Sequence, residues 1–319
     1  AYLAVYALLA IFVGFIVMAS ELAMGRKTGQ GAMGTYHALT KKFRWIGWLA
    51  LFSPFAVMGF YAVLGGYCIE YMALNLSNFA FGSESLATGG ELFAAMLSNP
   101  AGAVLFAALF LALCYLINRS GISGGIEKFN NVGMPTLFVM LVVIIIRSLT
   151  LPGAEAGVSF YLSPDPSKLE KTGLFPVINA AMNQAFFTLS VGIGAMCIFG
   201  SYQGKDRSLT GEAMWIMGLD TFVALMAGLI IFPACFAFGV EPGSGPGLVF
   251  VTLPNIFNVM AGGQLWGTLF FIFMSFAALS TVIAVFENII SYSADVWGME
   301  RRRATWLHAV GIWVCSRSI

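Results

Sequence analysis

The sequence contains few charged residues. Asp, Glu, Lys and Arg make up 10% of the 319 residues, whereas hydrophobic types make up 59%. Soluble domains carry about 25% charged residues, so this composition excludes an ordinary soluble globule. The 16 basic and 15 acidic side chains nearly cancel, and binding to nucleic acid requires a basic face. We therefore expect no nucleic-acid partner.

Residues that commonly carry catalysis are also scarce. The sequence has two histidines and shows no Ser-His-Asp set, no phosphate-binding loop and no metal-ligand spacing. This absence argues against an enzyme. The cysteines all lie in apolar runs without a Cys-x-x-Cys pair, so we predict that they are buried core residues. They are Cys68, Cys114, Cys197, Cys235 and Cys315.

Long apolar segments are what the sequence has in abundance. Seven segments are long enough for the roughly 20 residues that cross a bilayer, which predicts an all-α, polytopic membrane helix bundle. They run from Ala1 to Met24, Ile46 to Leu76, Ala101 to Asn118, Val132 to Leu151, Leu174 to Tyr202, Ala213 to Gly239 and Gln264 to Asp295. An eighth, from Thr305 to Ile319, is shorter. Because the chain opens inside an apolar run without a charged leader, we expect an internal fragment, not a signal peptide.

Lysine and arginine counts predict the orientation. The connectors after the first, third, fifth and seventh segments hold 12 of these residues, and the intervening connectors hold 3. Cytoplasmic loops carry the excess of positive charge, so the first segment is expected to run from outside to inside. An odd number of spans, most simply one, is then expected upstream, and at least part of one more downstream.

Two connectors have patterns of their own. The outer connector from Val240 to Gly263 has Gly/Pro turns followed by about twelve mostly apolar residues, too few to span, which predicts a re-entrant or capping element. On the inner side, residues Gly34 to Lys42 are expected to form a short interfacial helix.

The fifth segment carries polar and small residues in its middle. Thr188 and Ser190 are followed by Gly192 and Gly194, a pattern that would let the helix open and expose backbone groups to a ligand. Irregular backbone survives at membrane depth only where it lines a cavity or is buried in protein. The alternative is that these small residues only allow close helix packing. Both interpretations remain open from the residues alone.

Asp220 lies within a long apolar segment. An acid at the centre of a spanning helix costs about 2.5 to 3.5 kcal/mol on insertion scales, and a bound cation would offset that cost. The alternatives are another protein partner or access to water. Other acids lie nearer span ends, where solvation or a basic neighbour such as Arg26 suffices. They are Glu21, Glu70, Glu127, Glu287 and Asp295.

Two further segments carry candidate polar groups. Ser280 and Thr281 are adjacent hydroxyls in an apolar helix, and Thr281 shares a face with Val285 by i, i+4 spacing. Such hydroxyls usually bond to the backbone of their own helix. Val57 and Tyr61 share a face in the second segment, where a lone tyrosine is more often a packing residue.

Several motifs together resemble the neurotransmitter:sodium symporter family, particularly its bacterial amino-acid transporters similar to the leucine transporter. They cover nearly the whole chain: ELAMGR (Glu21 to Arg26), GISGGIEKF (Gly121 to Phe129), MPTLF (Met134 to Phe138), FFTLSVGIG (Phe186 to Gly194), LDTFVALMAGLIIFPA (Leu219 to Ala234) and TLPNIF (Thr252 to Phe257). The resemblance implies an inverted-repeat transporter fold of twelve spans, with a broken helix around 188–194. Residues 1–319 would then be one transmembrane transporter domain, about spans two to eight and part of nine.

The resemblance also implies roles for single residues. Phe187 matches an aromatic lid over the substrate, and Asp295 matches the acid of the cytoplasmic gate. Residues that match the substrate site are Val57, Tyr61, Phe187, Ser190, Ile193, Thr281 and Val285. Two sodium sites are implied. Thr188 and Asp220 match the first, and the carbonyl of Ala277 with the hydroxyls of Ser280 and Thr281 matches the second.

One position departs from the family pattern. Asp220 stands where many members have asparagine, and Ala224 stands where one chloride-independent member has glutamate. In chloride-dependent members, residues matching Tyr6, Gln184 and Thr188 lie near a chloride that balances the sodium charge. We hypothesise that Asp220 supplies that negative charge, so that chloride is not required.

Together these features predict sodium-coupled symport of a neutral, hydrophobic amino acid by alternating access. We expect a multi-pass protein of a lipid bilayer, the bacterial plasma (inner) membrane. Two alternatives remain. The first is a proton-coupled amino-acid permease of the same architecture, with Asp220 as the titrating group. The second is a non-transporting amino-acid sensor.

Overall fold

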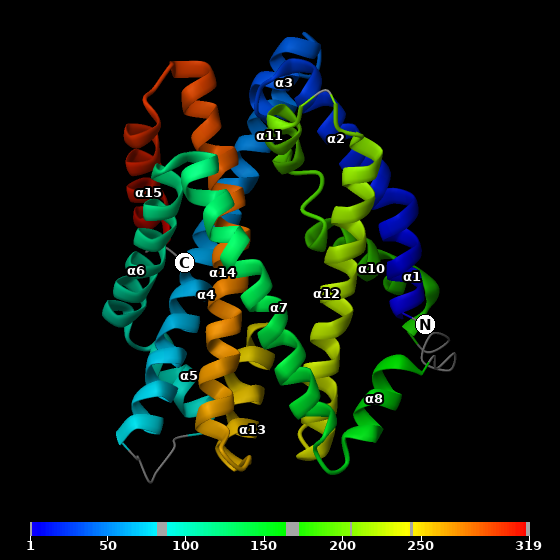
Figure 1. Cartoon of the computed structure of the whole chain (residues 1–319), viewed down its shortest axis with the longest axis vertical. Helices are drawn as coiled ribbons and strands as arrows, with labels where there is room; N and C mark the ends of the chain where they lie inside the picture. The colour runs from blue at the N-terminus through cyan, green and yellow to red at the C-terminus, as the bar shows by residue number, and fades with distance from the viewer. Residues whose placement is uncertain (1, 82–87, 164–171, 205, 243–244, 317–319) are drawn as a thin grey trace. The chain divides into compact units, whose positions relative to one another are not determined.

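The structure, a computed structural model, describes residues 2–81, 88–163, 172–204, 206–242 and 245–316. Lys205 and parts of the outer connectors 77–100, 147–171 and 240–263 lie outside the described residues. Every element within the described ranges is helical (Figure 1). This confirms the all-α membrane bundle that the apolar segments predict.

Two compact units divide the chain. The first comprises residues 1–57, 164–225 and 284–308, and the second comprises residues 58–163, 226–283 and 309–319. Four long or terminal helices contribute residues to both units: α4 (Arg44–Phe81), α12 (Leu209–Ala237), α14 (Gly263–Trp297) and α15 (Arg301–Ser316). The remaining elements of the first unit are α1 (Tyr2–Leu9), η1 (Ala10–Gly14), α2 (Phe15–Thr28), α3 (Ala32–Leu39), α10 (Leu174–Thr188) and α11 (Ala195–Tyr202). Those of the second are α5 (Gly89–Leu97), α6 (Pro100–Arg119), η2 (Ile122–Ile126), α7 (Glu127–Leu149), α8 (Ala154–Leu162), η3 (Leu248–Thr252) and α13 (Leu253–Val259).

Six of the seven predicted spans are continuous helices of sufficient length and hydropathy within the described residues. They are Tyr2–Thr28, Arg44–Ala80, Pro100–Arg119, Ile122–Leu149, Leu209–Ala237 and Gly263–Trp297. The fifth predicted segment is instead divided into α10 and α11. Its two halves are too short to cross a bilayer singly, because a span needs about 20 residues.

The core of the first unit lies where α1 and α2 pack against α10 and α11. Met18 and Leu22 of α2 are fully buried there, together with Ala181 of α10. Gly25 allows the close approach of α2 and α11, since a Cβ at this position would lie 1.8 Å from the Cys197 carbonyl oxygen. Small residues at helix interfaces commonly allow such close approach in membranes. There, helix association depends on close packing because the hydrophobic effect does not act between helices in lipid.

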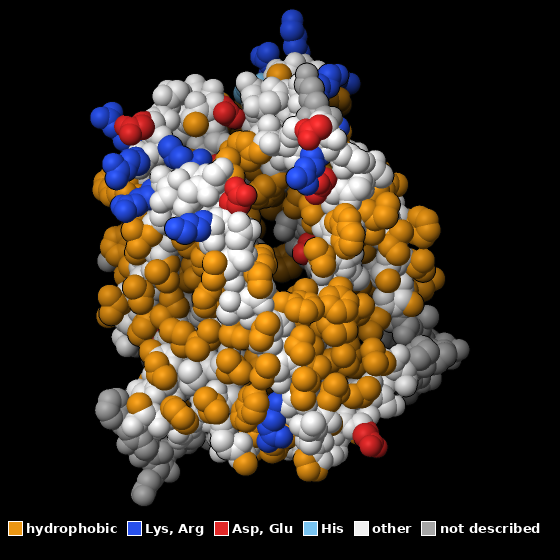
Figure 2. Space-filling view, in the orientation of Figure 1, with side chains coloured by type: hydrophobic (Ala, Val, Ile, Leu, Met, Phe, Trp, Pro, Cys, Tyr) orange, Lys and Arg blue, Asp and Glu red, His pale blue; other side chains and the backbone are white. Residues whose placement is uncertain are grey.

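In the first unit the basic side chains gather at one end. Figure 2 shows blue side chains around α3 and the neighbouring end of α12, and a band of hydrophobic side chains farther along α12. On α12, the side chains of Trp215, Leu219 and Phe222 are exposed. Most of the cations that the sequence predicts to face the cytoplasm belong to this unit, whereas Arg119 and Lys128 belong to the second.

The core of the second unit is an aromatic cluster around η3. Phe250 stacks on Phe93 of α5 at 5.6 Å between ring centroids, and Tyr71 of α4 stacks on Phe271 of α14 at 4.8 Å. The Tyr71 hydroxyl also donates a hydrogen bond to the Phe250 carbonyl at 2.5 Å. These contacts hold η3 and α13, which form one short apolar helix from Leu248 to Val259. The predicted twelve-residue element that is too short to span is thereby confirmed.

Two local expectations need adjustment. The short helix expected at 34–42 is present as α3, but it begins at Ala32 and ends at Leu39. Four cysteines are buried as predicted, whereas Cys315 is exposed, so the prediction for Cys315 is wrong. Cys315 lies beside exposed Val314 on α15, and an apolar run of a membrane protein presents one face to lipid instead of to the protein core.

Candidate substrate and sodium site

A break in the helix separates α10 from α11. The helix ends at Thr188 and resumes at Ala195, as the irregular segment in Figure 1 shows. Gly192 and Gly194 have φ values of 86° and 74°, a region that glycine adopts without steric cost. This confirms the break predicted around 188–194 and favours the opening of the helix over simple packing.

Ser190 is the strained residue of the break. Its φ of 51° makes it the one non-glycine residue with positive φ in the described part of the chain. Such a conformation costs about 1–3 kcal/mol and persists only where the surroundings enforce it. Two hydrogen bonds to the end of α10 hold it: the Ser190 and Val191 amides donate to the carbonyls of Phe187 and Phe186, at 3.2 Å each.

Glu21 of α2 binds backbone amides on the C-terminal side of the break. One carboxylate oxygen accepts a hydrogen bond from the Gly192 amide at 2.8 Å, and the other accepts from the Met196 amide at 3.3 Å. The residue is 4% exposed. Glu21 therefore satisfies backbone donors that the interrupted helix leaves without partners, which is a common role for an acid at a helix N-terminus.

The sequence interpretation of Glu21 is wrong. Neither water nor Arg26 compensates its charge: Arg26 donates instead to the carbonyls of Gly204 and Arg207, at 3.3 and 2.6 Å. The partners of Glu21 are backbone amides 171 and 175 residues away. No pattern near Glu21 in the sequence could have identified them.

The first predicted sodium site draws on α10 and α12 of the first unit. The Thr188 hydroxyl accepts a hydrogen bond from the Gln184 side chain at 3.0 Å. Asp220 lies midway along α12 and is partly buried. Among the described residues, no hydrogen bond joins Thr188 and Asp220.

The second predicted sodium site is a compact group on α14 in the second unit. The Ala277 carbonyl accepts hydrogen bonds from the Ser280 and Thr281 hydroxyls, at 2.8 and 3.2 Å. Three oxygens thus lie within one helical turn. These are also the bonds to the helix's own backbone that hydroxyls in membrane helices usually make, so the geometry fits both interpretations of these residues.

The predicted substrate residues are distributed over the two units. Val57, Phe187, Ser190, Ile193 and Val285 belong to the first unit, and Tyr61 and Thr281 belong to the second. Phe187 is 59% exposed at the end of α10, next to the break. Val285 is buried on α14, and the Tyr61 ring meets Phe60 edge-on at 5.9 Å.

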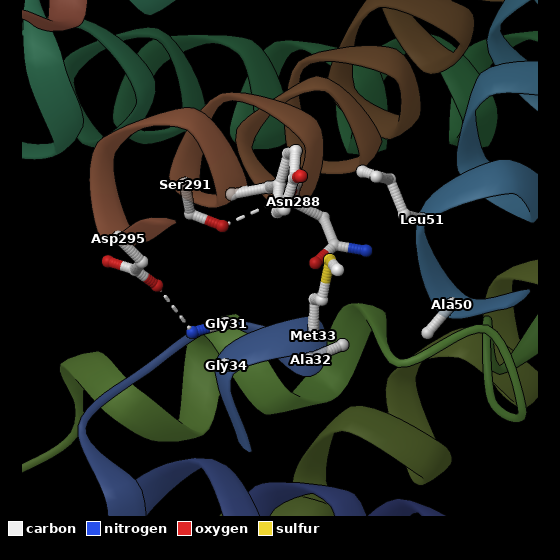
Figure 3. A pocket seen from close by; sticks show the side chains of 10 residues that line it. Gly31, Ala32, Met33, Gly34, Ala50, Leu51, Asn288, Ser291 and Asp295 are labelled. Carbon is white, nitrogen blue, oxygen red and sulfur yellow. Dashed lines mark hydrogen bonds between the residues drawn. The ribbon is translucent and has the colours of Figure 1, made fainter. Parts of the chain in front are cut away.

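Asp295 lies at a small pocket between α3, the start of α4 and the end of α14, all within the first unit. Its Oδ2 accepts a hydrogen bond from the Gly31 amide at 2.9 Å (Figure 3). Met33, Leu51 and Asn288 also line this pocket. The acid predicted to serve the cytoplasmic gate is therefore attached to the N-terminus of α3.

Glu287 has a basic neighbour, as the sequence allows, but the ion pair is buried near this pocket. Glu287 of α14 has no solvent exposure and accepts hydrogen bonds from Arg301 Nη1 and Nη2, at 2.9 and 2.5 Å. The Tyr202 hydroxyl at the end of α11 donates to the same carboxylate at 2.8 Å. Burial would lower the pKa of Arg301, but the adjacent Glu287 outweighs burial and raises that pKa above its ordinary value. The arrangement ties the second half of the broken helix to α14 and α15.

Comparison with known proteins identifies the family of this chain. Residues 97–318 match the "Sodium:neurotransmitter symporter family". The chain is 33% identical to the "Uncharacterized sodium-dependent transporter YhdH" of Bacillus subtilis (strain 168), over 99% of this chain and 70% of that protein. It is 32% identical to an "Uncharacterized sodium-dependent transporter" of Haemophilus influenzae, over 98% of this chain and 70% of that protein.

A solved structure has the same fold. The crystal structure of MhsT in complex with L-phenylalanine superposes with a TM-score of 0.90 at 36% sequence identity, covering 99% of this chain and 71% of that one. The structural match, the family match and the apolar helices together establish a multi-pass membrane protein. It has the fold of sodium-coupled transporters, which are not enzymes. The chain belongs to the sodium:neurotransmitter symporter family.

Proposed function

We propose that this protein carries a neutral, hydrophobic amino acid together with sodium across the plasma membrane of a bacterium. The observation that carries the proposal is the break between α10 and α11. No hydrogen bond among the described residues uses the carbonyl oxygens of residues 189–193. A helix break of this kind supplies backbone oxygens and amides to a polar substrate or a cation at membrane depth.

The substrate class is supported by the residue types at the proposed substrate positions. Val57, Ile193 and Val285 are aliphatic, and Phe187 is an exposed aromatic residue at the end of α10. Tyr61 would bind the substrate carboxylate through its hydroxyl, and Ser190 and Thr281 would line the pocket. MhsT, which shares the fold, was solved with L-phenylalanine.

Two sodium sites are part of the proposal. Thr188 with Asp220 would form one, and Ala277, Ser280 and Thr281 would form the other. Carboxylate, hydroxyl and carbonyl oxygens suit a hard cation. The three oxygens of the α14 group already lie within one helical turn, so this group requires little rearrangement to face an ion.

We also propose that transport needs no chloride. The Asp220 carboxylate would balance the sodium charge, and Ala224 offers no acid of its own one turn later. The Tyr6 hydroxyl is buried without a hydrogen-bond partner among the described residues. Tyr6 matches a chloride neighbour of chloride-dependent members, so replacement of chloride in the uptake assay is the direct test of this proposal.

Coupling between the ligands would follow from their proximity. Sodium beside the substrate carboxylate strengthens binding of the amino acid, and linkage requires the reverse to hold equally. Closure of Phe187 over the pocket, followed by opening towards the cytoplasm at Asp295, would complete alternating access. Each net charge that moves down the membrane potential contributes about 2.3 kcal/mol per 100 mV, which suffices to concentrate an amino acid.

The test is uptake of labelled amino acids by the purified protein in proteoliposomes, with an inward gradient of sodium or of choline. We expect sodium-dependent accumulation of one or a few hydrophobic amino acids. Thr188→Val should raise the sodium concentration needed for half-maximal uptake. The matched control Thr136→Val should not, because Thr136 lies exposed on α7 with its hydroxyl bonded to the Val132 carbonyl.

Other outcomes assign other functions. Accumulation driven by a pH gradient without sodium would establish a proton-coupled permease, and tight binding without flux would establish a sensor. A loss of uptake when gluconate replaces chloride at constant sodium would remove the proposed charge-balancing role of Asp220.

A further inference from the structure

An exposed basic and aromatic surface lies where α3 turns into α4, in the first unit. Lys41, Lys42 and Arg44 are all exposed there. Phe43, Trp45 and Trp48 lie among them and are 44%, 58% and 46% exposed. We refer to these six residues as the 41–48 surface. Aromatic rings and cations thus alternate on one exposed surface.

No acid among the described residues forms an ion pair with the cations of the 41–48 surface. The sequence has no Asp or Glu between Glu21 and Glu70. Lys42 instead lies over the Phe43 ring, with Nζ 5.4 Å from the ring centroid. The surface is therefore complementary to a negatively charged partner.

The 41–48 surface adjoins exposed apolar side chains along α4, and we refer to Trp48 and Phe52 as the apolar ridge. Trp48 stacks on Phe52 one turn further along α4, with ring centroids 6.4 Å apart, and Phe52 is 64% exposed. Leu49 is exposed beside them. A cationic end followed by an apolar ridge on a membrane-spanning helix matches an amphiphile with an anionic head and an acyl chain. Aromatic rings of this type are enriched at the membrane interface.

The buried side of this segment contacts the functional end of the unit. Gly47 backs onto Met33 of α3, and Trp48 lies 6.4 Å from Tyr292 of α14. Through α3 the segment also reaches the bond between Gly31 and Asp295 (Figure 3). A ligand that fixes the 41–48 surface would thus fix the position of α3 against α14.

We propose that the 41–48 surface binds an anionic phospholipid of the cytoplasmic leaflet. Lys41, Lys42 and Arg44 would contact its phosphate headgroup, and the ridge of Trp48 and Phe52 would contact an acyl chain. Each basic residue near an anionic membrane surface contributes about 1 kcal/mol, which corresponds to roughly five-fold in affinity. Loss of all three cations is therefore expected to weaken binding by roughly 100-fold.

The experiment measures quenching of tryptophan fluorescence by phospholipids that are brominated on their acyl chains. The purified protein, in micelles of an uncharged detergent, is titrated with brominated phosphatidylglycerol or with equally brominated phosphatidylcholine. We expect phosphatidylglycerol to quench at a mole fraction at least ten-fold lower. Trp48→Phe should remove part of this quenching, because Trp48 lies on the ridge.

Two triple variants distinguish a site from general charge. Lys41→Gln/Lys42→Gln/Arg44→Gln should bind phosphatidylglycerol roughly 100-fold more weakly and lose the preference over phosphatidylcholine. The matched control Arg119→Gln/Lys128→Gln/Arg302→Gln removes the same charge from other cytoplasmic connectors and should keep that preference. Circular dichroism and elution volume verify that both variants are folded.

Three results would overturn the proposal. Equal quenching of the unaltered protein by the two lipids would show no selectivity for negative charge. Equal loss in the two triple variants would show that general positive charge is responsible. Competition by glycerol phosphate at the same concentration as the lipid would show a site for a soluble anion, without a role for the apolar ridge.

Discussion

Glu21 and Glu287 are two buried carboxylates of the first unit that are satisfied in different ways. Glu21 accepts hydrogen bonds from backbone amides of the helix break and has no ion-pair partner in the described structure. Glu287 accepts two hydrogen bonds from one guanidinium and one from a tyrosine hydroxyl. The first carboxylate stabilises an irregular backbone, and the second joins regular helices. This difference indicates that Glu21 is the more directly tied to the proposed binding site.

The largest expected effect belongs to Glu21→Ala. The substitution leaves the Gly192 and Met196 amides buried without acceptors, at roughly 1–3 kcal/mol each. We expect a large loss of thermal stability in detergent and loss of sodium-dependent uptake. Ser20→Ala is the control, because Ser20 is the exposed neighbour on α2. Equal stability of the two variants would show that the amides find other partners.

The next effect belongs to Arg301→Met. Removing one partner of a buried ion pair costs about 3–5 kcal/mol. The Arg301 side chain is 29% exposed, so we expect about 2–3 kcal/mol in the free energy of unfolding.

A double-mutant cycle separates the pair from its surroundings. Because Glu287→Gln removes the stranded charge, the double variant Glu287→Gln/Arg301→Met should be more stable than Arg301→Met alone. Arg302→Met is the control for loss of a positive charge nearby. Additive effects of the two substitutions would contradict a direct interaction.

A smaller effect is expected for Glu21→Gln. The amide oxygen can still accept from the Gly192 backbone, but the amide NH₂ then faces the Met196 donor. One orphaned donor costs roughly 1–3 kcal/mol, so thermal stability should lie between those of the unaltered protein and Glu21→Ala. A variant as unstable as Glu21→Ala would show that the charge matters more than the number of acceptors.

The smallest effect is expected for Tyr202→Phe. It removes one hydrogen bond to Glu287 and leaves both bonds from Arg301, so roughly 0.5–1.5 kcal/mol should be lost from the free energy of unfolding. Tyr115→Phe is the control, because the Tyr115 hydroxyl has no hydrogen bond among the described residues. A loss as large as that of Arg301→Met would contradict this expectation, because Tyr202 would then contribute as much to the network as the guanidinium.

Local chemistry made the break and the α14 group predictable. Thr188, Ser190, Gly192 and Gly194 are close together in the sequence, and glycine at positive φ interrupts a helix wherever the chain folds. Ala277, Ser280 and Thr281 come together because one turn of helix places i−3 and i−4 carbonyls beside the hydroxyls. Neither outcome needs a distant segment.

Long-range contacts were the part that sequence patterns missed. Nothing near Glu21 indicates that it accepts from amides 171 and 175 residues later. Arg301 is only 14 residues from Glu287, yet their pairing depends on how α15 folds back beside α14. Exposed Cys315 was missed for a related reason, because hydrophobicity does not distinguish a face towards protein from a face towards lipid.

The sequence by itself determined the apolar helices, the place where one of them is interrupted, the short element at 248–259 and the family. These depend on hydropathy, glycine and motifs that are read within one segment. Only the tertiary structure decided which acids are buried and what satisfies them. The physical reason is that a buried carboxylate takes whichever donors packing brings to it, and packing joins residues from segments far apart in the chain.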